Sequence, residues 1–329
     1  MIYSDLILNE RNWGNLRSAI KNHRLHHALL FHGPSGVGKS AHAVELAAIL
    51  NCLQPTTEGA CGLCSSCIKV RTFQHENVKL ILPFPRKTGL DKNSPSIKAL
   101  SDVDLASLNE QMLEMGKNPY FKIVLENANT ILINSIRDLK NELYLSVPGG
   151  GSRIVLIMDA ELLCLPDPAS ANALLKILEE PPEKTYFILI SSRADLLLET
   201  ILSRCQKVFF PALSEKDIES YLTEEGESRS NAHLIANVSE GNMHLAQSFK
   251  GSVPQLYENA KTILNAVFTK QPDRWKKFHK EVNRMKKNSR VFFSNGDFCV
   301  QGFDDPGGNE RFRPGGFFRQ STEISCCAG

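Results

Sequence analysis

A glycine-rich segment is the first part of the sequence whose residue types and spacing could do chemistry. Residues 31–40, FHGPSGVGKS, match the phosphate-loop pattern G-x-x-x-x-G-K-[ST], with an apolar run before them and a helical pattern, AHAVELAAIL, after them. In such a loop the backbone N–H groups and the helix N-terminus attract a triphosphate, the lysine reaches its outer phosphates, and the hydroxyl holds Mg²⁺. The predicted ATP- and Mg²⁺-binding residues of the loop are Gly33, Ser35, Gly36, Gly38, Lys39 and Ser40. A glycine-rich turn without a ligand is the alternative, which the flanking patterns disfavour.

A carboxylate that follows a second strand pattern extends the same chemistry. Residues 153–158, RIVLIM, form a hydrophobic run that ends at Asp159, and an aspartate at this place in a phosphate-loop protein holds Mg²⁺. Hydrolysis generally also needs a glutamate directly after it, but this chain has Ala160 there and Glu161 one residue later. One step along a strand turns a side chain to the opposite face, so unless the backbone bends we expect Glu161 to be solvated or to cap a helix. The sequence therefore supports nucleotide binding better than hydrolysis.

Four cysteines that lie within sixteen residues form a second candidate site. Their spacing is C-x8-C-x2-C-x2-C, and they are Cys52, Cys61, Cys64 and Cys67. Four thiolates so close together can surround one Zn²⁺ tetrahedrally and close a structural site, whereas four unligated thiols are the alternative. A DNA-binding zinc ribbon is disfavoured because Lys69 and Arg71 are the only basic residues nearby. The sequence predicts a structural zinc module at 52–67.

Alternating patterns predict the elements that must position these residues. Short apolar runs alternate with helical stretches, which is typical of a parallel sheet covered by helices, an α/β fold. The predicted strands are 27–31, 78–82, 153–158, 186–190 and 207–210. After Pro211 the pattern becomes helical: Ser214 is a candidate cap of one helix, a second spans 228–238, and a third follows Gly241.

The bulk composition narrows the class of protein. A chain of 329 residues is long enough for two or three domains, and 42% hydrophobic residues are typical of globular proteins. A net charge of +2 gives no strong electrostatic footprint, so it neither indicates nor excludes nucleic acid as a partner. No apolar run approaches a membrane span, and the N-terminus lacks the apolar segment of a signal peptide. We therefore expect a cytoplasmic location and no membrane partner.

The C-terminal part of the sequence changes character twice. Residues 254–287 are again helical in pattern, whereas residues 288–329 hold seven of the 17 phenylalanines and three of the nine cysteines without any regular period. This tail, 288–329, is either an irregular disordered terminus or the product of a change of reading frame near Asn288. The polar segment 84–118 is typical of a surface excursion, and the sequence does not decide whether it is ordered.

Several motifs together resemble a known family. They are the phosphate loop, the cysteine spacing, INSIRDL at 133–139, LLKILEEPP at 174–182 and the triplet Ser203-Arg204-Cys205. Residues 3–250 resemble the clamp-loader subunits of bacterial DNA polymerase III, of the delta-prime and gamma/tau kind. The resemblance implies an AAA+ fold with a nucleotide-binding domain at 1–210, a helical lid at 211–252 and the start of a helical collar at 253–287. It also implies a hetero-pentamer with gamma/tau and delta subunits that opens the sliding clamp and sets it on primed DNA.

The same resemblance assigns roles to single residues. Arg204 would reach the nucleotide site of a neighbouring subunit as an arginine finger in trans. Ser191, or Ser192 beside it, falls near the first sensor position of the family. The gamma type carries Asp-Glu after the second strand pattern and a sensor arginine in the lid, where this chain has Ala160 and His244. These departures favour a delta-prime-like component of the DNA polymerase III holoenzyme that binds ATP and hydrolyses it weakly or not at all.

Three other functions remain as alternatives. The first is a gamma/tau-type ATPase motor of the same loader. The second is a freestanding zinc-containing DNA-binding protein, which the small net charge disfavours. The third is a metabolic phosphate-loop kinase, for which the sequence offers no residues that would build an acceptor pocket.

Overall fold

The sheet that carries the candidate site is parallel and has five strands. The computed structural model describes residues 1–86, 91, 94–143, 151–253 and 261. The chain divides into two units, residues 1–271 and 272–329, and every described residue lies in the first. The strands are β1 (Ala28–His32), β2 (Val78–Ile81), β3 (Arg153–Ile157), β4 (Thr185–Ser191) and β5 (Gln206–Phe209). Their order is β2-β3-β4-β1-β5, and every pairing is parallel. The predicted α/β sheet is confirmed, with each strand boundary within one residue.

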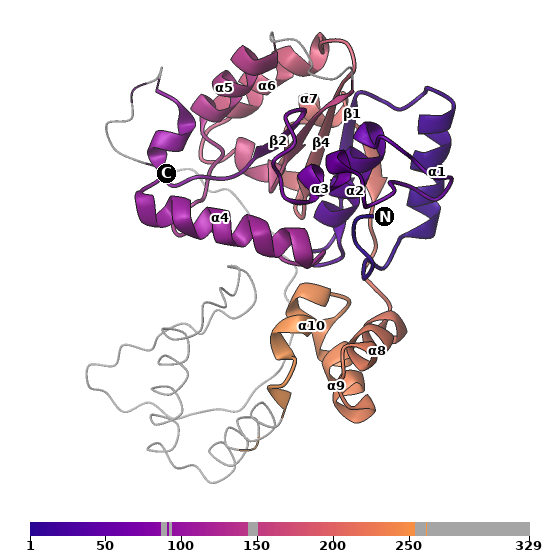
Figure 1. Cartoon of the computed structure of the whole chain (residues 1–329). Helices are drawn as coiled ribbons and strands as arrows, with labels where there is room; N and C mark the ends of the chain where they lie inside the picture. The colour runs from indigo at the N-terminus through magenta and orange to yellow at the C-terminus, as the bar shows by residue number, and fades with distance from the viewer. Residues whose placement is uncertain (87–90, 92–93, 144–150, 254–260, 262–329) are drawn as a thin grey trace, which may run out of the picture. The chain divides into compact units, whose positions relative to one another are not determined.

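Helices cover both faces of this sheet (Figure 1). Leu29 and Phe31 of β1 point to the face where α2 (Lys39–Asn51) packs, and Leu30 points to the opposite face. That opposite face is covered by α5 (Ile133–Leu143), α6 (Ala169–Glu179) and α7 (Glu199–Leu202). Because a parallel strand buried on both faces cannot alternate, β1, β3 and β4 are apolar along their central residues and carry polar residues only near their ends. α1 (Glu10–Lys21) and α3 (Ser65–Arg71) add to the α2 side.

The polar segment 84–118 contains a sixteen-residue helix. α4 (Asp102–Lys117) follows a 3₁₀ turn, η1 (Ser96–Ala99). Ser101 and Asp104 form a reciprocal capping box at the start of α4, in which Ser101 Oγ accepts from Asp104 N at 3.2 Å. Buried Leu108 and Met115 lie on its inner face. The Ser-x-x-Asp pair and this seven-residue spacing are the sequence signals that could have located the helix.

Three helices follow the sheet, as the sequence predicts. They are α8 (Glu215–Glu224), α9 (Arg229–Ser239) and α10 (Met243–Phe249). Ser214 caps α8 by accepting from Asp217 N at 3.1 Å, which confirms the predicted cap. One buried residue from each helix belongs to the hydrophobic core on the α2 side of the sheet: Ile218, Ile235 and Met243. The predicted collar, 253–287, and tail, 288–329, lie outside the described residues except for positions 253 and 261.

The remaining short elements are η3 (Ala160–Leu163) after β3 and η4 (Ala194–Leu196) after β4. Both lie at carboxyl ends of strands, where the phosphate loop also begins. Among the described helices, none combines the length and the apolarity that a membrane crossing requires.

Candidate nucleotide site and cysteine cluster

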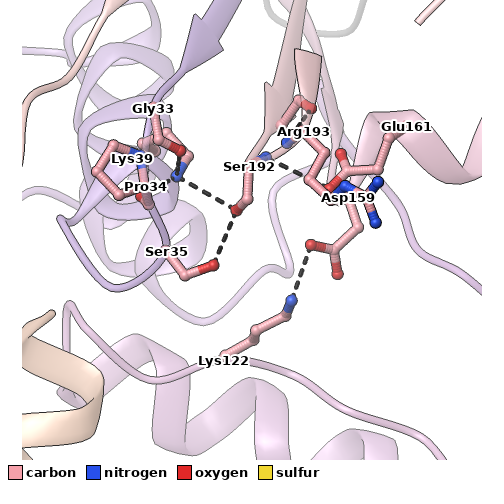
Figure 2. Close-up of polar contacts among 10 residues, drawn as sticks. Gly33, Pro34, Ser35, Lys39, Lys122, Asp159, Glu161, Ser192 and Arg193 are labelled. Atoms are coloured by element: carbon pink, nitrogen blue, oxygen red, sulfur yellow. Dashed lines mark hydrogen bonds and ion pairs between the residues drawn. The ribbon is translucent and has the colours of Figure 1, made fainter. Parts of the chain in front are cut away.

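The predicted phosphate-binding residues gather at the carboxyl edge of the sheet. The loop 33–38 leaves β1, Asp159 follows β3 and Ser192 follows β4, so the parallel sheet brings segments far apart in sequence to one edge (Figure 2). Gly36 and Gly38 adopt the left-handed region at φ +72° and +82°. Gly38 is also the N-cap of α2 and supplies no side-chain acceptor for its first amides. The start of α2 is therefore electrostatically suited to an anion.

Lys39 lies inside the loop and is almost completely buried. Its Nζ donates to the carbonyl oxygens of Gly33 at 2.8 Å and Pro34 at 2.5 Å. Burial lowers the pKa of Lys39 to about 8; Glu161 and Asp159 oppose this shift and Lys122 adds to it. The ammonium of Lys39 therefore loses its proton at a lower pH than an ordinary lysine, and a bound phosphate would stabilise its charged form.

Asp159 forms an ion pair with Lys122, a lysine that belongs to none of the sequence motifs. The backbone of Asp159 is left-handed, with φ +46° and ψ +53°. Its Oδ1 accepts from Lys122 Nζ at 2.9 Å, and Lys122 comes from the segment that follows α4. No motif surrounds Lys122, and 37 residues separate the pair, so no sequence signal connects the two side chains.

The expectation that Glu161 is solvated or caps a helix is wrong. Glu161 is only 7% exposed, and its Oε1 accepts from Ser192 N at 3.4 Å. The left-handed turn at Asp159 ends the strand, and η3 then begins, so the two-residue alternation no longer applies and Glu161 turns inward. Its Oε2 has no hydrogen-bond partner within the described part of the chain. A buried carboxylate with an orphaned oxygen is thus aimed at the edge where Asp159 and Lys39 lie.

Of the two serines considered for the sensor position, the structure brings Ser192 to the loop. Ser192 Oγ accepts from Ser35 Oγ at 3.1 Å and from Lys39 Nζ at 3.4 Å. Ser191 is fully buried, and its Oγ accepts from Arg193 N at 3.1 Å. Because β4 extends through Ser191, the alternation of the strand directs Ser191 into the core and leaves its neighbour at the edge.

The third C-terminal helix contacts the phosphate loop directly. The first amide of α10, Met243 N, donates to Gly36 O at 3.0 Å. A Cβ at Gly36 would overlap the side chain of Asn242, so any other residue there would have to displace that side chain. His244 Nδ1 donates to Tyr120 O at 3.1 Å, and burial lowers the pKa of His244. His244 therefore lies beside the loop as a neutral side chain. It occupies the position at which the resemblance to the gamma type implies a sensor arginine.

A buried histidine in α2 connects the loop with the N-terminal segment. His42 Nδ1 donates to Gly38 O at 2.8 Å, and its Nε2 accepts from Asn9 N at 3.2 Å. Its ring packs edge-on against Trp13 and Phe210. Burial lowers the pKa of His42 to about 4, so the ring is neutral and both nitrogens are used. No motif singles out His42, because all its partners except Gly38 lie far from it in the sequence.

Arg204 lies at the surface, in the turn between α7 and β5. Its Nη2 forms an ion pair with Glu179 Oε1 at 2.6 Å, and its Nη1 donates to Thr200 O at 2.9 Å. The side chains of Arg204 and Glu179 are 34% and 50% exposed. The described contacts of Arg204 include no residue of the phosphate loop, Asp159 or Ser192.

The four cysteines of the candidate metal site converge as their spacing predicts. Their Sγ atoms all lie within 4.8 Å of one another, and three of the separations are 3.5, 3.9 and 4.0 Å. Zinc–sulfur bonds of about 2.3 Å place tetrahedral sulfurs about 3.8 Å apart, so the arrangement fits a tetrahedral metal ion. Burial raises the pKa of the Cys64 thiol, but the amide of Cys67 and neighbouring hydrogen bonds outweigh it and bring the pKa to about 6. These four thiols could hold a metal.

The site residues also fit a nucleotide with Mg²⁺. Magnesium prefers oxygen ligands. Asp159 and Glu161 bring carboxylate oxygens to the edge of the sheet where the loop lies (Figure 2), and Ser40 adds a hydroxyl in the first turn of α2. The uncapped amides of α2 and the buried ammonium of Lys39 suit the phosphates.

Comparison with known proteins identifies relatives in bacterial DNA replication. The family model described as DNA polymerase III, delta subunit, matches residues 8–214, which include the loop, the cysteines, Asp159 and Arg204. The DNA polymerase III subunit delta' of Bacillus subtilis is 29% identical over 275 residues, which cover 81% of this chain and 69% of that protein. The subunit delta' of Escherichia coli is 28% identical over 65% of this chain and 51% of its own length.

Tau and tau/gamma subunits of DNA polymerase III from several bacteria match as well. Among solved structures, a DNA polymerase III gamma subunit-related protein from Thermotoga maritima aligns with a TM-score of 0.37 at 18% identity, over 70% of this chain and 58% of that one. The chain thus spans about two thirds of the B. subtilis relative and about half of the E. coli relative.

Proposed function

The chain belongs to the DNA polymerase III, delta subunit family, and from this premise we propose that it acts as the delta-prime-like subunit of a bacterial clamp loader. In this proposal it joins gamma/tau and delta subunits in a hetero-pentamer and helps to place the sliding clamp on primed DNA. Residues 1–210 form an AAA+ nucleotide-binding domain, 211–252 a lid and 253–287 the start of a collar. The observation that carries the proposal is the position of Arg204.

Arg204 is suited to act on a neighbouring subunit. It is partly exposed, and its ion pair with Glu179 holds the guanidinium at the surface instead of directing it to the loop of its own chain. A guanidinium is always charged and has five N–H donors in a planar fork, so the bonds to Glu179 and Thr200 leave donors for a phosphate. We infer that Arg204 neutralises charge on the outer phosphates of a nucleotide bound next door.

The chain's own site is proposed to bind ATP with Mg²⁺ and to turn it over slowly. Lys39 and the amides of α2 would hold the phosphates, and the hydroxyl of Ser40 would hold a metal ion that arrives with the nucleotide. Ala160 occupies the place where an efficient hydrolase of this type has its glutamate. Zinc at the four cysteines would have a structural role, because all its ligand positions would be filled by sulfur.

Reconstitution of the loader tests the proposed role of Arg204. The chain is mixed with the tau/gamma and delta subunits of the same bacterium, and clamp loading onto primed DNA and ATP turnover are measured. We expect Arg204→Ala to lower clamp loading by at least about tenfold, because it removes one charge-assisted phosphate contact. Arg204→Lys is expected to be intermediate, since it keeps the charge without the fork.

Arg229→Ala is the matched control, because Arg229 is 90% exposed on α9 and its ion pair with Glu219 lies away from the phosphate loop. Size-exclusion chromatography of each mixture separates failed assembly from failed catalysis. A fully assembled Arg204→Ala complex that loads clamps as well as the Arg229→Ala complex would contradict the proposal.

The buried Glu161 favours a second candidate, a gamma-type ATPase motor. Its carboxylate lies beside Ser192 N, and its Oε2 is free to polarise a water molecule or to approach a metal ion. The test is ATP turnover by the isolated chain. Brisk turnover that both Glu161→Gln and Lys39→Ala abolish would establish the motor, whereas negligible turnover in the presence of tight nucleotide binding would exclude it.

A further inference from the structure

Lys122 is a cationic side chain at the candidate nucleotide site that no motif accounts for, and it forms an ion pair with Asp159. Its Nζ lies 2.9 Å from Asp159 Oδ1, and the two side chains are 43% and 21% exposed. Figure 2 shows Lys122 extending from the segment after α4 toward Asp159, on the opposite side of the site from the sheet. Asp159 is the carboxylate for which a phosphate-loop protein ordinarily uses Mg²⁺ as the counter-ion.

The backbone around Lys122 is fixed on both sides. Tyr120 OH accepts from Ile7 N at 2.8 Å, and Tyr120 O accepts from His244 at 3.1 Å. Two residues after Lys122, Val124 exchanges two hydrogen bonds with the side chain of Gln111, at 2.7 and 3.0 Å. A lysine held between two anchored residues loses less conformational freedom on pairing than one on a free loop. The pair is therefore better defined than an ordinary surface ion pair.

Lys122 also faces the other charged groups of the site. Burial is the main reason why the pKa of Lys39 is lowered, and the positive charge of Lys122 lowers it further. The same charge contributes, after burial, to the lowered pKa of His244 on α10. The ammonium of Lys122 therefore acts on the phosphate loop and α10 as well as on Asp159. A divalent cation that approached Asp159 would meet this charge.

We propose that Lys122 is a built-in counter-cation of Asp159, which takes over at that carboxylate the part usually played by Mg²⁺ and thereby supports nucleoside triphosphate binding without a divalent ion. The inference rests on the proposed nucleotide site. An ammonium has three N–H donors, so pairing with Asp159 leaves donors for an anionic oxygen. Because Lys122 and Lys39 are both positive, a triphosphate would reduce the repulsion between them.

Nucleotide binding with and without Mg²⁺ tests this inference. The full chain is titrated with a fluorescent N-methylanthraniloyl ATP analogue in EDTA and in excess MgCl₂. We expect the Kd of the unmodified chain to differ by less than about threefold between the two buffers. Lys122→Met should weaken binding in EDTA by about tenfold and make binding strongly dependent on Mg²⁺, whereas Lys122→Arg should keep the original behaviour.

Two further variants control for indirect effects. Lys117→Met removes an exposed lysine at the end of α4 whose ion pair is with Glu114, and it should leave both Kd values unchanged. In an Asp159→Asn background the effect of Lys122→Met in EDTA should shrink, because the carboxylate that Lys122 neutralises is gone. Circular dichroism and thermal unfolding check that each variant is folded.

Two results would overturn the inference. One is binding by the unmodified chain that Mg²⁺ strengthens at least about tenfold, with the same ratio in Lys122→Met. The other is the absence of nucleotide binding in both buffers. Neither result touches the proposed role of Arg204, which is measured on the partner subunits' turnover and on clamp loading.

Discussion

The cysteine cluster and the candidate nucleotide site are built in opposite ways. The cluster takes four identical ligands from residues 52–67, and amides of the same segment donate to its sulfurs, for example Cys61 N to Cys52 Sγ at 3.3 Å. The nucleotide site combines groups of both charge signs from β1, β3, β4, α10 and the segment after α4. A cluster of the first kind can stabilise a fold but has no position for a substrate. A site of the second kind can respond to nucleotide, metal and protons.

Removal of one cysteine should have the largest effect and should affect only one of these regions. Cys67 is fully buried, so we expect Cys67→Ser to lose the metal that the chain would hold and to unfold the segment around α3. The loss of stability should exceed about 3 kcal/mol, because structural zinc binding contributes about 10–16 kcal/mol in small finger peptides. Metal content is measured by mass spectrometry, and local opening by hydrogen exchange.

The control for this experiment is Cys164→Ser, which removes a thiol that lies outside the cluster and packs on the opposite face of the sheet. Nucleotide binding should survive Cys67→Ser if the two regions are independent. If Cys67→Ser abolishes nucleotide affinity along with metal binding, the contrast between a self-contained cluster and a distributed site breaks down, and α2 would be the element that couples them.

Protonation of His42, which is bonded to the phosphate loop, should lower the stability of the folded chain. Its pKa falls from 6.5 to about 4 in the folded chain, so the unfolded chain binds a proton that the folded chain excludes. Stability from His42 is therefore fully present above about pH 6.5 and is lost as the pH falls toward 4, by about 3 kcal/mol in total. Urea unfolding of the unmodified chain and of His42→Gln, compared at about pH 7.5 and about pH 5, measures this loss.

Only the difference between the two chains is informative in that experiment. Acid also releases zinc from thiolates and protonates other histidines, but these effects are shared by both chains. The unmodified chain should lose about 2 kcal/mol more than His42→Gln over this range. Equal losses would show that the proton acts elsewhere and that His42 does not link the loop to the N-terminal segment.

The two regions also differ in how much of them the sequence could predict. The cysteine spacing predicts the cluster completely, because all its ligands are within one short segment and need only two turns to converge. The apolar runs predict the central strands β1, β3 and β4, since burial on both faces leaves a nearly continuous apolar pattern, and shorter runs predict the edge strands β2 and β5. The phosphate loop was predictable because its residues, like the cysteines, lie within one short segment.

The rest of the nucleotide site depends on tertiary structure. Lys122 and His42 have no local signal, because their partners are 37 and 33 residues away. Glu161 was assigned to solvent on the alternation of an ideal strand, and a single left-handed residue, Asp159, reverses that conclusion. The sequence did not determine which of Ser191 and Ser192 faces the loop. Because β4 extends one residue beyond the predicted strand end, Ser191 is buried and Ser192 contacts the loop.

The smallest of the expected effects tests whether α10 belongs to the nucleotide site. Gly36 and Gly226 both have left-handed φ angles, +72° and +91°, so alanine costs about 1 kcal/mol of backbone strain at either position. A Cβ at Gly36 would also overlap Asn242, which caps α10, whereas a Cβ at Gly226 meets nothing. We therefore expect Gly36→Ala to lose about 2 kcal/mol and Gly226→Ala about 1 kcal/mol in urea unfolding. Equal losses would mean that α10 moves away from the loop at no cost, so that the distributed site would consist of the sheet edge and the Lys122 segment alone.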